Sequence, residues 1–412
     1  MAEHQAQAFW CYDHLDDRDG SVTRFRDALE RAVNKVARQP FRIFQDRLHI
    51  DWGQPWRERI RAVLDQSQFL IPILTPNFIH SEECRRELDY FLEVEVRRGR
   101  TGLILPVEFY PMREAGHSTA PHRDHLVEEL QSRQRLDWTA HRSEPIEKRE
   151  KALAKMAAQL ARAFEQPAPR PSVLRVGSAN GKFRTIESAL RAAKRWDRIE
   201  VAEEVYTEAV RVDTCVDIVG RGSRDRIVVQ AVNEDVISFQ ADRGRIANLT
   251  IRKLGEEIDG RRFGSGVHVT RGLLLLEDND ISSTGLSRVS VQRAAWPRVR
   301  GNRIHDGRNE GVHLSNGAGG VREDNRIYRN GFAGVAIWAD ADPRVTSNDL
   351  YEGAAEGVYV GGGGRGLLDH NTIRDNHVSG ITIEVGAHPI VKDNYIYGNG
   401  PEGKVKVIDR NL

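Results

Sequence analysis

Residues 81–88 gather several side chains that could do chemistry. The segment reads Ser81-Glu82-Glu83-Cys84-Arg85-Arg86-Glu87-Leu88. A serine followed by acidic residues is typical of a helix start, so we expect Ser81 to cap this helix. No histidine motif accompanies Cys84, which favours packing over a nucleophilic role. By context alone Glu87 is a solvated helix residue, and a catalytic role for its carboxylate needs further support.

The two parts of the chain that would position such groups differ in composition. Residues 1–166 contain 5 of the 36 glycines and 2 asparagines, whereas the remainder contains 31 glycines and 15 asparagines. Between them lies a Pro-rich stretch that lacks backbone donors and favours an extended spacer. A chain of 412 residues also exceeds one ordinary core. We predict a first domain at 1–166, a linker at 167–171 and a second domain at 172–412.

Short apolar runs alternate with amphipathic segments in the first domain. Strands are expected at 8–12, 41–44, 69–74, 102–109 and 135–138, and helices at 22–36, 55–64 and 147–164. Buried strands separated by helices predict an α/β domain whose parallel sheet is covered on both faces. Ligands of such folds bind at the carboxyl ends of the strands.

A period of 23 residues runs through the second domain. The repeated asparagines are Asn279, Asn302, Asn325, Asn348, Asn371 and Asn394, and a glycine column from Gly311 to Gly403 keeps the same step. Alternating apolar residues follow both columns, as in short strands with one buried face. This period predicts a solenoid, here an all-β parallel β-helix of about ten coils. We interpret the asparagines as structural, because Asn tolerates left-handed turns and stacked amides can bond from coil to coil.

The ends of the repeat depart from the pattern. Residues 185–194 have helical spacing and are expected to cover the first coil. The repeat before Asn279 is stretched to 31 residues and holds a polar loop at 255–262. In the last coil Lys404 and Lys406 take the apolar slots, which predicts a capping coil with a polar end.

Another column lies three residues after each asparagine and is expected to point outward. Its members are His305, Tyr328, Tyr351, Arg374 and Tyr397. Such a ladder could bind a sugar, a nucleotide or another protomer, or it could stabilise neighbouring coils. Asp340 and Asp342 are spaced like paired carboxylates, but Pro343 favours a turn there.

Three motifs of the first domain together resemble a TIR domain. They are Ala8-Phe9-Trp10-Cys11-Tyr12 with an acidic loop after it, Phe44-Gln45-Asp46 with Trp52-Gly53, and the segment 81–88. The segment Arg133-Gln134-Arg135-Leu136-Asp137-Trp138 adds a late strand that is common in bacterial members. The resemblance covers about residues 5–140 and implies a flavodoxin-like α/β fold.

In TIR domains that cleave NAD, the glutamate before the leucine of this helix is catalytic, and it corresponds to Glu87. Nicotinamide is a cationic leaving group that departs neutral, so no general acid is needed, unlike in ordinary glycosides. A carboxylate can stabilise the oxocarbenium-like ribose and hold its hydroxyls. Water, or the adenine of the same molecule, then attacks. The resemblance therefore implies NAD+ as substrate, an NAD+ glycohydrolase or cyclase activity, and no metal or other cofactor.

The resemblance also implies a nucleotide pocket around the glutamate. Its expected residues are Tyr12, His14, Asp46, Trp52, Gly53, Trp56, Ser81 and Glu83. Trp52 could stack on a base, or Trp52 and Trp56 could fix their loop to the core. Many family enzymes carry a tryptophan where this chain has Glu83, and a second acidic group there could raise the pKa of Glu87 or simply point to solvent.

The second domain resembles the pectate-lyase-like right-handed β-helices. Phe183-Arg184-Thr185-Ile186, Ile199-Glu200-Val201 and Tyr206-Thr207-Glu208 carry this likeness. Many relatives process polysaccharides, so a carbohydrate-binding or carbohydrate-processing β-helix is one alternative function. A noncatalytic TIR scaffold for protein assembly is the other.

Composition narrows the classes of partner. A net charge of +1 argues against nucleic acid, and no apolar run approaches the ~20 residues that cross a membrane. Three widely spaced cysteines argue against a disulfide framework and a zinc site. Because the chain begins without a secretory signal, we expect a cytoplasmic protein. The resemblance implies antiphage defence or signalling, a homo-oligomer, and a β-helix that takes an unknown ligand or activator.

Overall fold

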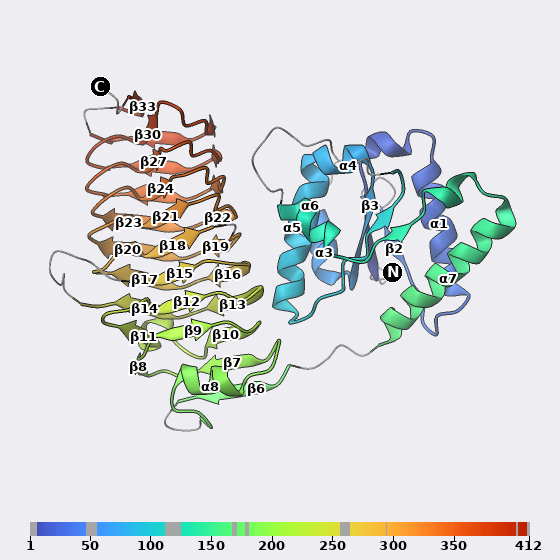
Figure 1. The fold of residues 1–412 in the computed structure, drawn as a ribbon, viewed down its shortest axis with the longest axis horizontal. Coiled ribbons are helices and arrows are strands. Elements are labelled where there is room, and N and C mark those ends of the chain that lie inside the picture. Colours follow the sequence, from blue (N-terminus) through green and yellow to red (C-terminus); the bar gives the residue numbers. More distant parts are fainter. Residues whose placement is uncertain are drawn as a thin grey trace. The chain divides into compact units, whose positions relative to one another are not determined.

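The computed structural model describes residues 6–46, 56–111, 125–166, 171–177, 181–255, 264–293, 295–400 and 403–409. The chain forms two compact units, Met1–Arg170 and Pro171–Leu412, which Figure 1 draws in blue to green and in green to red. Among the described residues, no helix combines the length and the apolar character that a bilayer crossing requires.

The first unit is built on one parallel sheet of five strands in the order β2-β1-β3-β4-β5. The strands are β1 (Ala8–Cys11), β2 (Ile43–Phe44), β3 (Phe69–Leu74), β4 (Val107–Glu108) and β5 (Leu136–Asp137). All residues of β1 and β3 are buried, as expected for central strands covered on both faces. The predicted α/β class is confirmed, although the strand expected at 102–109 is reduced to β4.

Helices cover both faces of this sheet (Figure 1). They are η1 (His14–Asp17), α1 (Ser21–Asn34), α3 (Trp56–Gln66), α4 (Pro76–His80), α5 (Glu82–Arg97), α6 (His125–Gln131), η2 (Ala140–Ser143) and α7 (Ile146–Glu165). Helices α1 and α7 pack together on one face, and α5 contacts α3, α4 and α6 on the other. The amino-terminal end of α5 thereby lies beside the carboxyl end of β1.

The second unit is a parallel β-solenoid of three sheets, which confirms the predicted fold (Figure 1). The first sheet contains β6 (Val173–Val176), β7 (Arg198–Val201), β10 (Asp217–Gly220), β13 (Arg243–Ala247), β16 (Leu273–Glu277), β19 (Arg298–Arg300), β22 (Val321–Glu323), β25 (Arg344–Thr346), β28 (Leu367–Asp369) and β31 (Ile390–Lys392). The second contains β8 (Val205–Thr207), β11 (Val228–Ala231), β14 (Thr250–Lys253), β17 (Asp280–Ser283), β20 (Arg303–Gly307), β23 (Arg326–Asn330), β26 (Asp349–Tyr351), β29 (Thr372–Arg374) and β32 (Tyr395–Tyr397). The third contains β9 (Val210–Val212), β12 (Ile237–Phe239), β15 (Val267–Val269), β18 (Val289–Gln292), β21 (Val312–Ser315), β24 (Val335–Ile337), β27 (Val358–Val360), β30 (Ile381–Glu384) and β33 (Val405–Ile408).

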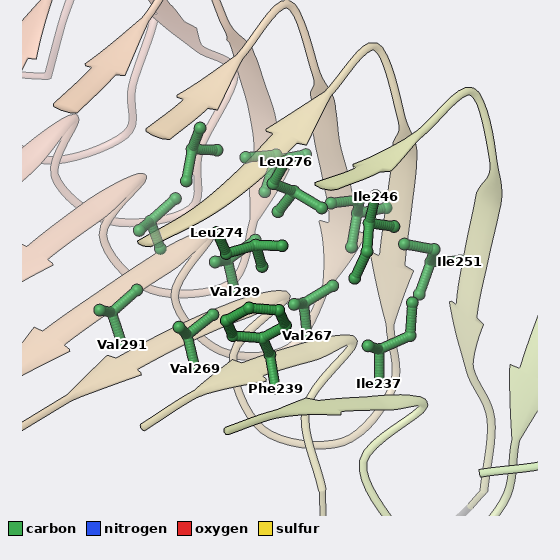
Figure 2. Close-up of a cluster of buried hydrophobic side chains, with 14 of the residues drawn as sticks. Ile237, Phe239, Ile246, Ile251, Val267, Val269, Leu274, Leu276, Val289 and Val291 are labelled. Atoms are coloured by element: carbon green, nitrogen blue, oxygen red, sulfur yellow. The ribbon is translucent and has the colours of Figure 1, made fainter. Parts of the chain in front are cut away.

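Equivalent residues of successive coils lie side by side in the sheets. Ile304, Ile327 and Leu350 pair in register and are almost fully buried. Figure 2 shows side chains of this kind, among them Phe239 and Leu276, directed into the interior of the solenoid. Stacked apolar rows therefore supply the core of the second unit.

The repeated asparagines form a buried ladder along the solenoid. In each step the backbone N–H and the side-chain amide of one asparagine donate to Oδ1 of the next, as Asn302 does to Asn325 at 3.0 and 3.1 Å. These bonds support a structural role for the asparagines. The prediction that the asparagines themselves take left-handed turn conformations is wrong. Positive φ angles occur one residue earlier, for example 57° at Asp324 and 52° at His370.

A second amide ladder, which the sequence analysis overlooked, runs five residues further along each coil. The backbone N–H of Gly353 donates to Oδ1 of Asn376 at 3.0 Å, and that of Asn376 donates to Oδ1 of Asn399 at 3.0 Å. Glycine takes this position in some coils, which hides the 23-residue step from a search for asparagines.

The first coil is covered by α8 (Ile186–Ala192), as predicted. Thr185 caps this helix, and its side chain accepts from the backbone N–H of Ser188 at 3.1 Å. The stretched coil is 30 rather than 31 residues long, because Leu249 and not Asn248 bonds to Asn279. Asn248 instead takes a left-handed position, with φ of 58°.

The last coil corrects a prediction. Ile381 pairs with Val405 and Ile383 with Val407, so one residue is inserted and the apolar slots hold valines rather than Lys404 and Lys406. Val405 and Val407 are 47% and 66% exposed. The inward slots of the last described coil are therefore apolar and partly exposed, and the predicted polar residues do not fill them.

Of the buried arginines in the described solenoid, Arg288 and Arg322 are completely enclosed, with 0% exposure. Arg288 donates to the carbonyls of Asn309 and Glu310 at 2.7 and 2.8 Å. Arg322 takes the inward slot that valines hold in the neighbouring coils, and it donates to the carbonyl of Gly319. Its Nε and Nη2 atoms have no hydrogen-bond partner among the described residues. Burial, together with the positive charge of Arg298, lowers the pKa of Arg322 to about 9.

Candidate active site

Glu87 lies in the amino-terminal half of α5, where its carboxyl meets the end of β1. The thiol of Cys11, the last residue of β1, donates to the backbone carbonyl of Cys84 at 3.8 Å and also interacts with the Glu87 carboxyl. Part of the Glu87 residue reaches solvent, but the carboxyl group itself is enclosed by protein atoms. The amphipathic pattern of α5 explains this placement, because Cys84 and Leu88 on the same helix are buried against the sheet.

The surroundings of Glu87 favour its neutral form. Burial raises the pKa of Glu87 from 4.5 to about 8, and the negative charges of Asp46 and Glu83 add to this increase. The hydrogen bond from Cys11 acts in the opposite direction. Burial, the interaction with Cys84 and the negative charge of Glu87 all raise the pKa of the Cys11 thiol, so Cys11 is a hydrogen-bond donor here and not a thiolate.

His14 and Asp46 approach each other beside this carboxyl group. Nε2 of His14 lies 2.6 Å from Oδ2 of Asp46, and the ring of His14 lies 5.2 Å from that of Tyr12. The loop that carries His14 is fixed by Asp16, which accepts from Thr75 at 2.5 Å and from Asn77 at 2.7 Å. Residues from three separate segments therefore converge at the carboxyl end of the sheet.

Ser81 and Glu83 lie at the start of α5. Ser81 is the residue before the helix, yet its side chain makes no capping hydrogen bond, so that part of the prediction is wrong. Glu83 pairs with Nη1 of Arg86 at 2.7 Å, and Glu82 pairs with Nη2 of the same residue at 2.9 Å. Arg86 thus partly offsets the extra negative charge near Glu87.

Three predicted pocket residues cannot be placed. Trp52 and Gly53 lie outside the described residues. Trp56 is the first residue of α3, and its side chain also lies outside the description. Sequence reasoning overlooked Cys11 as a site residue. Its signal was its position at the carboxyl end of a buried strand, where ligands of parallel α/β sheets bind.

Four members of the predicted ladder, from His305 to Arg374, stack on one another along the solenoid. The ring of Tyr328 lies between those of His305 and Tyr351, at centroid distances of 4.8 and 5.0 Å, and Arg374 lies 4.2 Å from the centroid of Tyr351. Tyr397, the last member, is 41% exposed. Because both faces of Tyr328 are covered from within the chain, this ring offers no face to a sugar or a base.

Acidic residues also enclose this ladder. His305 bonds to Asp280 at 3.0 Å and to Asp306 at 2.8 Å, and these carboxylates raise the pKa of His305 against the effect of burial. Arg374 bonds to Asp349 at 3.1 Å. The polar groups of the ladder are thus largely paired within the chain, an arrangement that stabilises neighbouring coils.

Other candidate sites are weaker. Asp340 lies in a turn with a left-handed backbone, φ of 60°, and Asp342 lies in the loop that follows, so the two are not side by side on a strand. Asp369, His370 and Asp393 hold possible metal-ligand atoms within 4.8 Å of one another, but Asp369 already pairs with His370 and Lys392. A cavity of about 600 Å³ lies between strands β3 to β5 and α7, and Glu87 is not among its lining residues.

Two family models match separate parts of the chain. A family model described as TIR domain matches residues 9–154, and one described as periplasmic copper-binding protein (NosD) matches residues 249–409. No curated protein matches the chain.

Among solved structures, the A-module of mannuronan C-5 epimerase AlgE4 from Azotobacter vinelandii is 14% identical with a TM-score of 0.42, covering 57% of this chain and 81% of that one. An alginate lyase from Paenibacillus is 16% identical with a TM-score of 0.29, covering 57% of this chain and 98% of that one. Pectin methylesterase from carrot is 13% identical with a TM-score of 0.30, covering 59% and 90%. Similarity this low carries no inference about a functional site. The second unit is assigned as a solenoid because its strands form three parallel sheets. Residues 9–154 of this chain therefore match the TIR-domain family, and the unit that follows is a parallel β-helix of three sheets.

Proposed function

We propose that the TIR domain is an NAD+ glycohydrolase or cyclase in which Glu87 is the catalytic residue. The single observation that carries this proposal is the enclosed Glu87 carboxyl, whose pKa is raised to about 8 at the carboxyl end of the sheet. Strongly shifted carboxyl groups in such positions are concentrated at active sites. A solvated helix glutamate would have neither the enclosure nor the shift.

The reaction breaks the bond between the ribose carbon and the nicotinamide nitrogen. The bonding electron pair stays on the ring nitrogen, which neutralises the cationic ring, so nicotinamide leaves without a general acid. The ribose carbon becomes positively charged, and the Glu87 carboxylate stabilises this charge. Water then adds to the carbon and releases a proton to give ADP-ribose, or the adenine attacks to give a cyclic product.

The acidic surroundings of Glu87 fit a cationic substrate. Asp46 and Glu83 disfavour the ionised form of Glu87 in the empty site. The same negative charges attract the positively charged nicotinamide end of NAD+. A bound cation lowers the pKa of a neighbouring carboxyl, so substrate binding favours the carboxylate that the reaction needs. We propose that Tyr12 and His14 contact NAD+ in this same site.

The proposal is tested by following NAD+ loss and nicotinamide release with the purified full-length protein over a wide range of concentrations. Glu87→Gln should lower the rate by about 100-fold or more, since it removes the stabilising charge. Glu82→Gln is the matched control, because Glu82 lies on the same helix with 75% of its side chain exposed. Mass analysis of the products distinguishes ADP-ribose from a cyclic isomer.

Activation by self-association would appear as a rate that rises faster than linearly with protein concentration. If NAD+ persists at every concentration, and also when residues 1–166 are fused to a forced oligomer, the chain is a noncatalytic TIR scaffold. Equal rates for Glu87→Gln and Glu82→Gln would exclude Glu87 as the catalytic residue.

A further inference from the structure

His14 and Asp46 form a close pair in the candidate active site, and this pairing decides which nitrogen of His14 carries the hydrogen. Nε2 of His14 lies 2.6 Å from Oδ2 of Asp46. A carboxylate only accepts hydrogen bonds, so Nε2 is the donor. The other ring nitrogen, Nδ1, is then the acceptor of a neutral ring, and no described residue bonds to it. The pair therefore leaves one basic nitrogen of His14 open.

His14 is also the more open of the polar groups at this site. Its side chain is 42% exposed, whereas that of Asp46 is 19% exposed. The carboxyl group of Glu87 is enclosed by protein atoms. A water molecule that enters the site from solvent therefore meets the ring of His14 before it meets the Glu87 carboxyl.

The acidic groups nearest in the chain to these residues already have partners. Glu83 pairs with Arg86 at 2.7 Å. Asp13 accepts from a backbone N–H in its own loop, Asp16 accepts from two side chains at the junction of β3 and α4, and Asp17 accepts from two backbone N–H groups in the first turn of α1. These bonds give the four acids structural roles and leave His14 as the accessible base.

Hydrolysis of NAD+ produces a proton that needs an acceptor, so the inference here rests on the proposed function. When water adds to the ribose carbon, a carbon–oxygen bond forms and one O–H bond of the water breaks. Nδ1 of His14 can take this proton, and the carboxylate of Asp46 stabilises the imidazolium that results. We propose that the His14–Asp46 pair is the general base for the attacking water, which makes His14 a second catalytic residue beside Glu87.

This role separates two classes of nucleophile. Water loses a proton as it bonds to the ribose carbon, whereas a pyridine attacks through its ring nitrogen and has no proton to lose. Added 3-acetylpyridine therefore gives a base-exchanged dinucleotide without a general base, from the same intermediate that gives ADP-ribose. The ratio of the two products reports on the base itself, because weaker binding of NAD+ would lower both products together.

The test supplies the full-length protein with NAD+ and 3-acetylpyridine and measures both products by mass. His14→Gln should lower the ratio of ADP-ribose to exchanged dinucleotide by about tenfold or more. Asp46→Asn should change the ratio in the same direction, since a neutral amide does not stabilise the imidazolium. His141→Gln is the matched control, because His141 pairs with Glu144 at 2.5 Å and lines a cavity to which Glu87 does not contribute.

The outcomes distinguish this inference from the proposed function. An unchanged ratio in His14→Gln, with NAD+ still consumed, overturns the inference alone and assigns the proton to Glu87 or to bulk water. Equal falls in His14→Gln and His141→Gln overturn it as well. Loss of both products in His14→Gln and in Asp46→Asn would mean that the pair serves the release of nicotinamide and not the water. If the wild type forms neither product at any concentration, the NAD+ proposal fails and this inference fails with it.

Discussion

Replacing Glu87 by glutamine should stabilise the TIR domain, and the gain should depend on pH. The folded state holds a proton on Glu87 up to about pH 8, whereas the ordinary pKa of this carboxyl is 4.5. Between these values the unfolded chain has lost the proton and the folded chain keeps it, so ionisation favours unfolding. The penalty is absent below pH 4.5, grows as pH rises, and reaches its full value above pH 8.

The size of this effect follows from the pKa difference. At pH 7, about 2.5 pH units above the ordinary pKa, the penalty is about 3 kcal/mol at most. Contact of the Glu87 residue with solvent reduces it, so we expect about 2 kcal/mol. The neutral amide of Glu87→Gln avoids the penalty. For a domain of this size the gain corresponds to about 5 °C in melting temperature.

The assay is thermal unfolding of the full-length protein at pH 4.5, 7 and 8.5. Glu87→Gln should melt with the wild type at pH 4.5 and above it at pH 7 and 8.5. Glu82→Gln, on the exposed side of the same helix, should follow the wild type throughout. A Glu87→Gln difference that is the same at all three pH values would refute the enclosed, protonated carboxyl.

Three further predictions concern pieces of the solenoid. Arg322→Leu should raise the melting temperature of the solenoid by several degrees, because it removes from an apolar row an enclosed charge whose Nε and Nη2 have no partner among the described residues; an unchanged or lower value would contradict this. Asn348→Ala should lower the free energy of unfolding by about 2 to 3 kcal/mol in urea titration, since it removes the acceptor of the Asn325 backbone and side-chain N–H groups and the donor to the carbonyls of Arg322 and Thr346; a loss below the error of the titration would argue against the ladder. Gly307→Ala should lower expression yield and melting temperature, because a Cβ at this position would lie 1.0 Å from Nη2 of Arg288, and Gly307→Ala combined with Arg288→Ala should recover part of the loss.

The sequence predicted the architecture well because periodic burial leaves a direct trace. The step of 23 residues from Asn302 to Asn325 follows the pairing of successive coils, and the alternation of buried strands with helices reports a covered parallel sheet. The register of the last coil was mispredicted, because one inserted residue shifts every slot and only strand pairing reveals which of Lys406 and Val407 lies inward.

The candidate site was accessible to sequence reasoning only through the family resemblance. Nothing in the spacing of Cys11 and Glu87, which lie far apart in the chain, indicates that the thiol reaches the carboxyl. The shift in the pKa of Glu87 depends on burial and on Asp46, and neither can be derived from local sequence. The side chain of Ser81 shows the same limit, since its position before α5 was predicted and its lack of a capping bond was not.

The two amide ladders have a consequence for how this protein can change in length. Each asparagine bonds only to the coils directly beside it, as Asn348 does to Asn325 and Asn371. A whole coil can therefore be duplicated or deleted in the middle of the stack without altering any bond beyond its immediate neighbours. Lineages of this protein should differ in length by multiples of 23 residues, while α8 is retained.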